Sequence, residues 1–174
     1  MIPKIIHQIW VGPYKLPNRE AQFVQEIKEK QPNFKHILWT NENIPELPSE
    51  LKKIFDLFES REEYTFQADL LRVFLVYTYG GIYLDIDFKI IKGFDDLDLD
   101  NNDNFVCNHF GEVETFPNGV FGASQNNPIL KTFIDNMIVE FPNRYWYGPS
   151  WHGNMMKQYF GCTEQHISHD EFAK

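Results

Sequence analysis

The 174-residue sequence predicts one α/β domain built on a mostly parallel β-sheet that is flanked by helices. Short apolar runs alternate along the chain with longer segments whose apolar residues recur at helical spacing, which is the pattern of repeated strand–helix units. The length is ample for one hydrophobic core, and the chain contains neither an internal repeat nor a low-complexity linker. These observations favour a single domain.

The first elements are two strands on either side of a helix. Residues 4–11 form an apolar run that Gly12-Pro13 closes, which indicates a strand. A helix is expected to begin at Asn18, a residue type that caps helix N-termini, and to end before Pro32. A second short strand is expected at 36–39.

Two helices are predicted next. Residues 51–58 carry apolar side chains at helical spacing, and Ser49 stands where a capping residue belongs. A longer helix over 62–79 is apolar on nearly all sides, and Gly80 follows it at the position where helices commonly stop. This second helix is therefore expected to be buried.

The rest of the chain contains a third strand, which carries Asp85 and Asp87, and a loop rich in Asp and Asn. The remaining predicted elements are strands at 105–109 and 120–123 and helices at 128–140 and 150–160. Ligands of open α/β sheets bind beyond the carboxyl ends of the strands. Residues 10–12, residues 40–42 and both aspartates stand at such ends.

The most informative segment is the aspartate pair Asp85 and Asp87, which ends an apolar run behind Gly80 and Gly81. In an extended backbone, residues i and i+2 point to the same side, so the two carboxylates would converge while Ile86 turned back into the protein. Two converging anions are costly unless a cation lies between them, and a hard divalent cation prefers oxygen ligands. The pattern predicts a metal site at the tip of a buried strand.

The preceding helix carries a charged pair, Asp69 and Arg72, whose spacing of three places both on one face. One interpretation is an ordinary helix ion pair, worth a few tenths of a kcal/mol and without functional meaning. The other is that a charged pair in an apolar helix holds a polar ligand. Because the helix leads directly into the metal-site strand, the second interpretation is preferred.

Composition excludes a general nucleic-acid binder. The formal net charge is -9 and the pI is near 5.1, whereas nucleic-acid binding needs a basic surface. The two cysteines, Cys107 and Cys162, are too few for a disulfide framework and favour a reducing compartment. No segment has the apolar length of a signal-peptide core or a membrane span, so a cytoplasmic location is expected.

Together these motifs resemble the sugar-binding DXD region of glycosyltransferase family 32, and the glucosylating clostridial toxins are similar in this region. The resemblance is carried by IPKIIHQIW at 2–10, QADLLR at 67–72 and YGGIYLDID at 79–87. A lone D-x-D is a weak signal, but the three blocks at this spacing are specific. The resemblance implies a glycosyltransferase A-type fold with a Rossmann-like sheet. It makes residues 1–174 one nucleotide-sugar-dependent domain, compact or truncated at its C-terminal end.

The activity implied by the resemblance is transfer of a hexose from a UDP- or GDP-linked donor to a glycan or protein-linked acceptor. Retention of configuration and a role in polysaccharide biosynthesis are implied as well, with Mn²⁺ or Mg²⁺ as the cofactor. Asp87 would coordinate the metal, and Asp85 would contact the metal shell and the ribose or sugar hydroxyls. Asp69 and Arg72 would hold hydroxyls of the transferred sugar, which makes these four residues the implied catalytic set.

Further substrate-binding residues are expected at other strand ends. By the resemblance, Trp10 would lie against the nucleotide base, and Ile9 and Val11 would supply backbone contacts. Asn41 is a candidate from its place at the end of the second strand, and Asn118 is a candidate for the acceptor side. The structural alternatives are a core position for Trp10 and a simple turn at Asn118.

The second half of the chain matches the family less well. Residues 151–157 faintly resemble the histidine, glycine and lysine lid of other retaining transferases. In that reading His152 would bind the metal and Lys157 would meet the diphosphate. A surface helix with an incidental histidine is the alternative.

Two other classes of function compete with a glycosyltransferase. Phosphatases of the haloacid dehalogenase type also place D-x-D after an apolar strand, but near the chain start and followed by Thr or Val. Here the motif is mid-chain and Phe88-Lys89 follow it. The second alternative is a nucleotide-sugar-binding module without catalysis, which would bind the donor and leave it intact.

Overall fold

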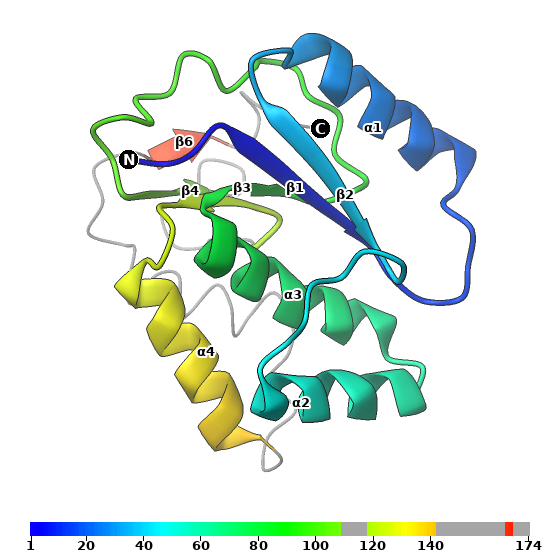
Figure 1. Cartoon of the computed structure of the whole chain (residues 1–174). Helices are drawn as coiled ribbons and strands as arrows, with labels where there is room; N and C mark the ends of the chain where they lie inside the picture. The colour runs from blue at the N-terminus through cyan, green and yellow to red at the C-terminus, as the bar shows by residue number, and fades with distance from the viewer. Residues whose placement is uncertain (109–117, 142–165, 169–174) are drawn as a thin grey trace.

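A computed structural model describes residues 1–108, 118–141 and 166–168 of the chain (Figure 1). The described strands are β1 (Ile5–Trp10), β2 (Lys35–Thr40), β3 (Gly81–Leu84), β4 (Asn104–Asn108), β5 (Val120–Ala123) and β6 (His166–Ser168). The described helices are α1 (Asn18–Lys30), α2 (Ser49–Ser60), α3 (Tyr64–Tyr79) and α4 (Pro128–Glu140). The helix predicted at 150–160 lies outside the described residues.

The strands form one sheet in the order β2-β1-β3-β5-β4-β6. β1 pairs in parallel with β2 and β3, and β4 pairs in parallel with β6, so the prediction of a mostly parallel sheet is confirmed. β5 runs antiparallel to its neighbours β3 and β4, which the sequence does not predict. As a consequence the start of β5 lies beside the end of β3, where Val120 is the partner of Leu84.

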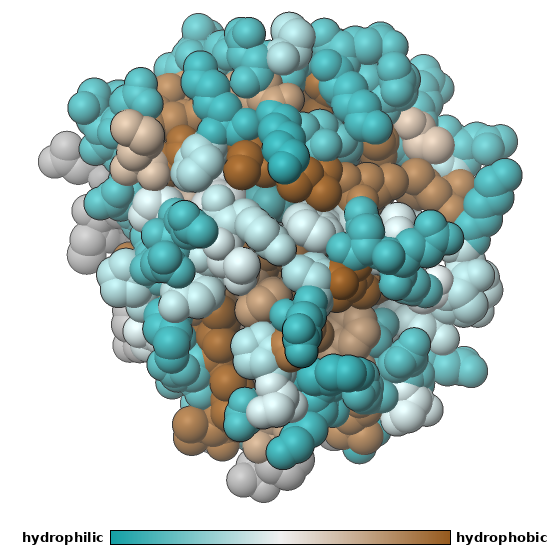
Figure 2. Space-filling view, in the orientation of Figure 1, coloured by the Kyte–Doolittle hydropathy of each residue, from teal (hydrophilic) through white to brown (hydrophobic). Residues whose placement is uncertain are grey.

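Apolar side chains bury both faces of the sheet. Helices α2, α3 and α4 pack together on one face, while α1 and the segment after β3 cover the other (Figure 1). Strand β3 serves both layers by the alternation of a pleated strand, because Tyr83 faces α3 whereas Ile82 and Leu84 face the opposite cluster. Hydrophilic residues predominate on the face in Figure 2, with apolar side chains in bands between them. None of the described helices is long and apolar enough to cross a membrane.

The predicted helix caps are wrong in two places. Asn18 and Ser49 are the first residues of α1 and α2, and neither helix receives a side-chain cap. The residues at the cap positions are Pro17 and Pro48, whose extended backbone leads into each helix. Proline fixes φ near −65° and so directs the chain into each helix, but its side chain has no acceptor for the first helical amides.

The glycine pair between α3 and β3 reverses the chain in little space. Gly80 has φ of 65° and Gly81 has φ of 108°, a region that side chains disfavour. A Cβ on Gly81 would stand 2.6 Å from the Ile5 carbonyl oxygen of β1. The pair therefore lets β3 start directly against β1. Helix α3 ends at Tyr79, so the predicted helix stop at Gly80 is confirmed.

The imidazole of His7 ties β1 to this turn from inside the core. Trp39 Nε1 donates to His7 Nδ1 (3.0 Å), so the remaining proton is on Nε2, which donates to the Gly80 carbonyl (2.8 Å). The ring also stacks with Trp39 and Tyr79. Burial lowers the pKa of His7 from 6.5 to about 4, although the bond to Gly80 opposes the shift. His7 is consequently a neutral structural residue.

We expect this histidine to make stability depend on pH. In the unfolded chain His7 takes up a proton near pH 6.5, whereas in the folded chain it does so only near 4. The unfolded state binds more protons between these values, so stabilisation present above pH 6.5 is lost as pH falls, by about 2 kcal/mol at roughly pH 5. Urea unfolding of the wild type and His7→Gln at about pH 7 and pH 5 should show the steeper loss in the wild type. Equal losses would contradict the assignment.

Candidate functional site

Strand β3 is buried along its length and ends at Leu84, directly before the two aspartates. The Asp85 amide still donates to the Gly119 carbonyl (2.8 Å), but Ile86 and Asp87 form a turn. The prediction of an extended backbone through Asp87 is therefore wrong, because β5 begins beside Leu84 and offers no ladder beyond it. Ile86 accordingly lines a cavity instead of turning into the protein, and Asp87 is exposed.

The guanidinium of Arg72, on α3, is the centre of the site. Its Nη2 lies 2.9 Å from Asp69 Oδ1, and its Nη1 lies 3.2 Å from Asp85 Oδ1. Nη1 also donates to the main-chain carbonyl of Asn118 (2.9 Å). The guanidinium stacks over the ring of Tyr83, with Cζ 4.6 Å from the ring centroid. The structure thus brings three other predicted site residues, Asp69, Asp85 and Asn118, into contact with the Arg72 cation.

Two polar atoms of this cluster have no partner among the described residues. Asp69 Oδ1 accepts from Arg72 and from Asn118 Nδ2 (3.1 Å), but Asp69 Oδ2 and Arg72 Nε are buried without a hydrogen bond. Both residues are almost fully buried, at 3% and 5% exposure. Buried polar groups are nearly always hydrogen-bonded, so unsatisfied ones need an explanation, and a bound polar ligand supplies one.

Burial governs the ionisation of the cluster. It raises the pKa of Asp69 and of Asp85, and in both cases the Arg72 guanidinium opposes the rise. Burial also raises the pKa of Tyr83 well above its usual value, so the phenol stays protonated and donates to Asp85 Oδ1 (2.6 Å). For Arg72 burial acts to lower the pKa, but Tyr83 and the aspartates outweigh it and raise the pKa. Arg72 therefore stays positively charged and forms ion pairs with two carboxylates whose pKa values are raised.

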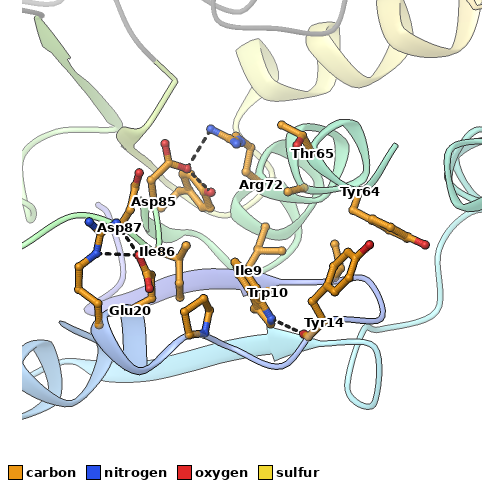
Figure 3. A pocket seen from close by; sticks show the side chains of 15 residues that line it. Ile9, Trp10, Tyr14, Glu20, Tyr64, Thr65, Arg72, Asp85, Ile86 and Asp87 are labelled. Carbon is orange, nitrogen blue, oxygen red and sulfur yellow. Dashed lines mark hydrogen bonds and ion pairs between the residues drawn. The ribbon is translucent and has the colours of Figure 1, made fainter. Parts of the chain in front are cut away.

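A cavity of about 550 Å³ opens beside this cluster (Figure 3). Its walls come from the end of β1 and the loop behind it, the start of α1, helix α3, and the end of β3. The predicted binding residues Ile9, Trp10 and Val11 line it together with Arg72 and the two aspartates of the motif. Trp10 is half-buried, and its Nε1 donates to the Tyr14 carbonyl (2.7 Å), which closes the loop that forms this wall.

Asn41 does not line the cavity. Its side-chain amide accepts from the Gly12 amide (3.0 Å) and donates to the Gly12 carbonyl (2.9 Å), so it holds the loop after β1. Gly12 has φ of 108°, and the Tyr64 ring covers it so closely that a Cβ would stand 2.8 Å from the ring. Asn41 therefore shapes the cavity wall indirectly. The predicted metal ligand His152 and the predicted diphosphate residue Lys157 lie outside the described residues.

Several residues of the site are not among those predicted from sequence. Tyr83 is one, although the alternation of a strand places it on the same side as Asp85, and this signal could have found it. Glu20 is another: its carboxylate lines the cavity and accepts from Arg19 Nη2 at 2.6 Å. Gly119 is the third. Its carbonyl accepts from the Asp85 amide, and a side chain at this position would collide with the Asp85 carboxylate.

The carboxylates fit a divalent metal that also binds phosphate. Asp85 Oδ1 is occupied by Tyr83 and Arg72, which leaves Oδ2, and Asp87 is exposed at the cavity. No cluster of three or more possible ligands occurs among the described residues. Mg²⁺ commonly uses one or two carboxylates and completes its shell with water and substrate phosphates, which matches a two-carboxylate site.

Comparison with known proteins identifies the sequence family and the fold. Residues 17–105 match the family described as "Glycosyltransferase sugar-binding region containing DXD motif". The chain is 31% identical to "Uncharacterized glycosyltransferase L373" of Acanthamoeba polyphaga mimivirus, over 80% of this chain and 57% of the relative. It is 30% identical to "Inositol phosphoceramide mannosyltransferase 1" of Schizosaccharomyces pombe, over 83% of this chain and 45% of the relative. The chain thus spans about half the length of these two relatives.

Two solved structures share the fold. "PaToxG Glycosyltransferase" superposes with a TM-score of 0.77 at 19% identity, covering 90% of this chain and 69% of that one. The "UDP-bound glycosyltransferase domain from the YGT toxin" superposes with a TM-score of 0.64 at 13% identity, covering 93% and 68%. The predicted glycosyltransferase A-type fold is therefore confirmed.

Removal of the central cation should destabilise the protein strongly. Arg72→Met keeps the aliphatic stem but leaves buried Asp69 without a counter-charge, and breaking such a pair costs about 3–5 kcal/mol. The folded variant binds protons more tightly than its unfolded chain, so its deficit relative to the wild type should shrink as pH falls from about 7 to 5. Urea unfolding at both pH values measures this.

The double variant Asp69→Asn/Arg72→Met is the matched control. It removes the stranded charge together with its partner, so we expect it to be more stable than Arg72→Met alone. A loss of under about 1 kcal/mol in the single variant, typical of an exposed pair, would contradict the central role of Arg72.

Proposed function

This chain belongs to the glycosyltransferases whose sugar-binding region contains the DXD motif, and we propose that it transfers a hexose from a nucleoside-diphosphate sugar. The donor is UDP- or GDP-linked, and the acceptor is a glycan or a protein-linked group. Transfer requires Mn²⁺ or Mg²⁺ and retains the anomeric configuration, as the family resemblance implies.

One observation carries this proposal: a buried, incompletely hydrogen-bonded Asp69–Arg72 pair adjoins a cavity that also exposes the two aspartates of the motif. A sugar offers hydroxyl groups that both donate and accept, so a hexose in the cavity would find partners in the charged side chains that line it, Arg72 and Asp85. The exposed carboxylates suit a metal that binds the diphosphate. Together these features support binding of the two halves of a sugar nucleotide side by side.

The cavity walls suggest how the donor is divided among the residues. Trp10 offers an aromatic face to the base, and Ile9 and Val11 lie beside it at the end of β1. At the other end Asp85 and Asp87 would hold the metal. When bound, that cation neutralises the departing nucleoside diphosphate and makes it a better leaving group. Asp69 and Arg72 would orient the hexose between these ends, with Asn118 behind them.

The names of the relatives guide the choice of donors to test. The Schizosaccharomyces pombe relative is named a mannosyltransferase, and the YGT toxin domain has UDP bound. Purified protein should therefore be incubated with UDP- and GDP-hexoses, Mn²⁺ and candidate acceptors, and released nucleoside diphosphate measured. Binding without release would favour the non-catalytic module, and NMR of the product would report the anomeric configuration.

Asp87→Ala should abolish metal-dependent release of nucleoside diphosphate while leaving the fold intact. The residue is exposed in a turn, so its loss removes a metal ligand without opening the core. Asp96→Ala, which removes an exposed aspartate from the following loop, is the matched control and should keep full activity. Full turnover by Asp87→Ala, or by the wild type in EDTA, would refute the metal role.

Asp69→Asn should weaken binding of the sugar nucleotide and leave binding of the free nucleoside diphosphate nearly unchanged. The amide keeps the shape of the carboxylate but cannot accept on both terminal atoms, so a hydroxyl contact is lost at the hexose end. A loss of about tenfold in affinity is expected, typical of one hydrogen bond to a charged group. Calorimetric titration with UDP and UDP-hexose, and with the GDP pair, tests it. Equal losses for both ligands would show that Asp69 is structural.

A further inference from the structure

We propose that Gly119 is a positioning residue that aims the Asp85 carboxylate, through the space that its missing side chain leaves and through its carbonyl oxygen. This inference rests on the proposed function of the site. Nothing in the sequence beyond a turn signal marks Gly119, and its role follows from two contacts with Asp85 and from the partners of the Asp85 carboxylate.

The first contact is steric. A Cβ built on Gly119 would stand 2.7 Å from Asp85 Oδ2 and 3.1 Å from two ring carbons of Phe88. Real Cβ atoms essentially never approach another heavy atom within 3.0 Å, so any side chain here would displace the carboxylate or the backbone. Gly119 does not have the positive φ that distinguishes Gly12, Gly80 and Gly81. The need for glycine at this position is therefore a need for room beside Asp85.

The second contact fixes the backbone of Asp85. Its amide donates to the Gly119 carbonyl at 2.8 Å, one residue beyond the last β3–β5 pair. The neighbouring residue, Asn118, gives its own carbonyl to Arg72 and its side-chain amide to Asp69. The two residues before β5 consequently hold the Asp85 main chain, Arg72 and Asp69 in one arrangement.

The third observation concerns which oxygen of Asp85 faces the ligand. Oδ1 accepts from Tyr83 and pairs with Arg72, so it is committed within the protein. Oδ2 is the oxygen that rests against Gly119, and the side chain keeps 29% exposure. Rotation of the carboxylate to escape a new Cβ would move the oxygen left for a metal or a hydroxyl. Gly119 thereby acts on the reaction through Asp85 without touching the substrate.

The test is Gly119→Ala, with Val120→Ala as the matched control. Val120 is buried at the next position, where β5 begins, so its truncation lowers stability without a new atom beside Asp85. Binding of Mn²⁺ in the presence of UDP, and then of GDP, is followed by Mn²⁺ EPR without turnover, and kcat/KM is measured separately. We expect Gly119→Ala to raise the half-saturating Mn²⁺ concentration at least about tenfold and to lower kcat/KM similarly. Val120→Ala should stay within about twofold of the wild type in both.

A second variant separates the effect of the new methyl group on the Asp85 carboxylate from its effect on the Phe88 ring. Gly119→Ala/Phe88→Leu removes the ring that the new methyl group also meets but leaves the contact with Asp85 Oδ2. The double variant should keep the Mn²⁺-binding defect. Recovery to wild-type binding, or wild-type Mn²⁺ binding by Gly119→Ala itself, would overturn the proposal. A wild type that binds Mn²⁺ with neither nucleotide would instead refute the proposed function.

Discussion

The buried Arg72 guanidinium is the interaction on which the rest of the site depends. It joins Asp69 on its own helix to Asp85 at the end of β3, and it lies on the Tyr83 ring. A buried ion pair is weak evidence for stability, because desolvation offsets much of the Coulomb attraction. Here the desolvated charges instead fix orientation: one cation sets the relative position of a helix, a strand end and the turn before β5. The arrangement makes a rigid polar surface on an apolar helix.

The reversed direction of β5 explains how a third element reaches this surface. In a fully parallel sheet the carboxyl end of the neighbouring strand would lie beside the end of β3. Because β5 is antiparallel, its start lies there, and Asn118 and Gly119 arrive with two main-chain carbonyls directed at the site. Backbone carbonyls of a turn anchored by a strand are held in fixed directions, which suits them to position charged groups. The departure from parallel topology is thus tied to the function of this edge.

Sequence reasoning succeeds where local periodicity or a compact motif dominates. The bounds of β5 and α4 agree with prediction, and Asp69, Arg72 and Asp85 do lie together. It fails where distant residues decide. The turn at Ile86 follows from where β5 starts, and the demand for glycine at position 119 comes from a carboxylate 34 positions earlier in the chain. Long-range pairing of this kind leaves no periodic trace in the sequence. Tyr83 is different, since strand alternation alone places it beside Asp85.

The charge balance of the cavity couples the two ligands that we propose for it. Of the described lining residues, the cations are Arg19 and Arg72, and each is already paired, with Glu20 and with the aspartates. An incoming diphosphate therefore meets no unengaged cation among them, in a chain of net charge -9. A divalent metal, in turn, finds no cluster of three possible protein ligands among the described residues, so beside the two motif carboxylates it needs further oxygen ligands. The metal supplies the positive charge that the diphosphate needs, and the diphosphate supplies oxygen ligands for the metal. Bound nucleotide should therefore raise the affinity for the metal, and bound metal should raise the affinity for the nucleotide by the same factor.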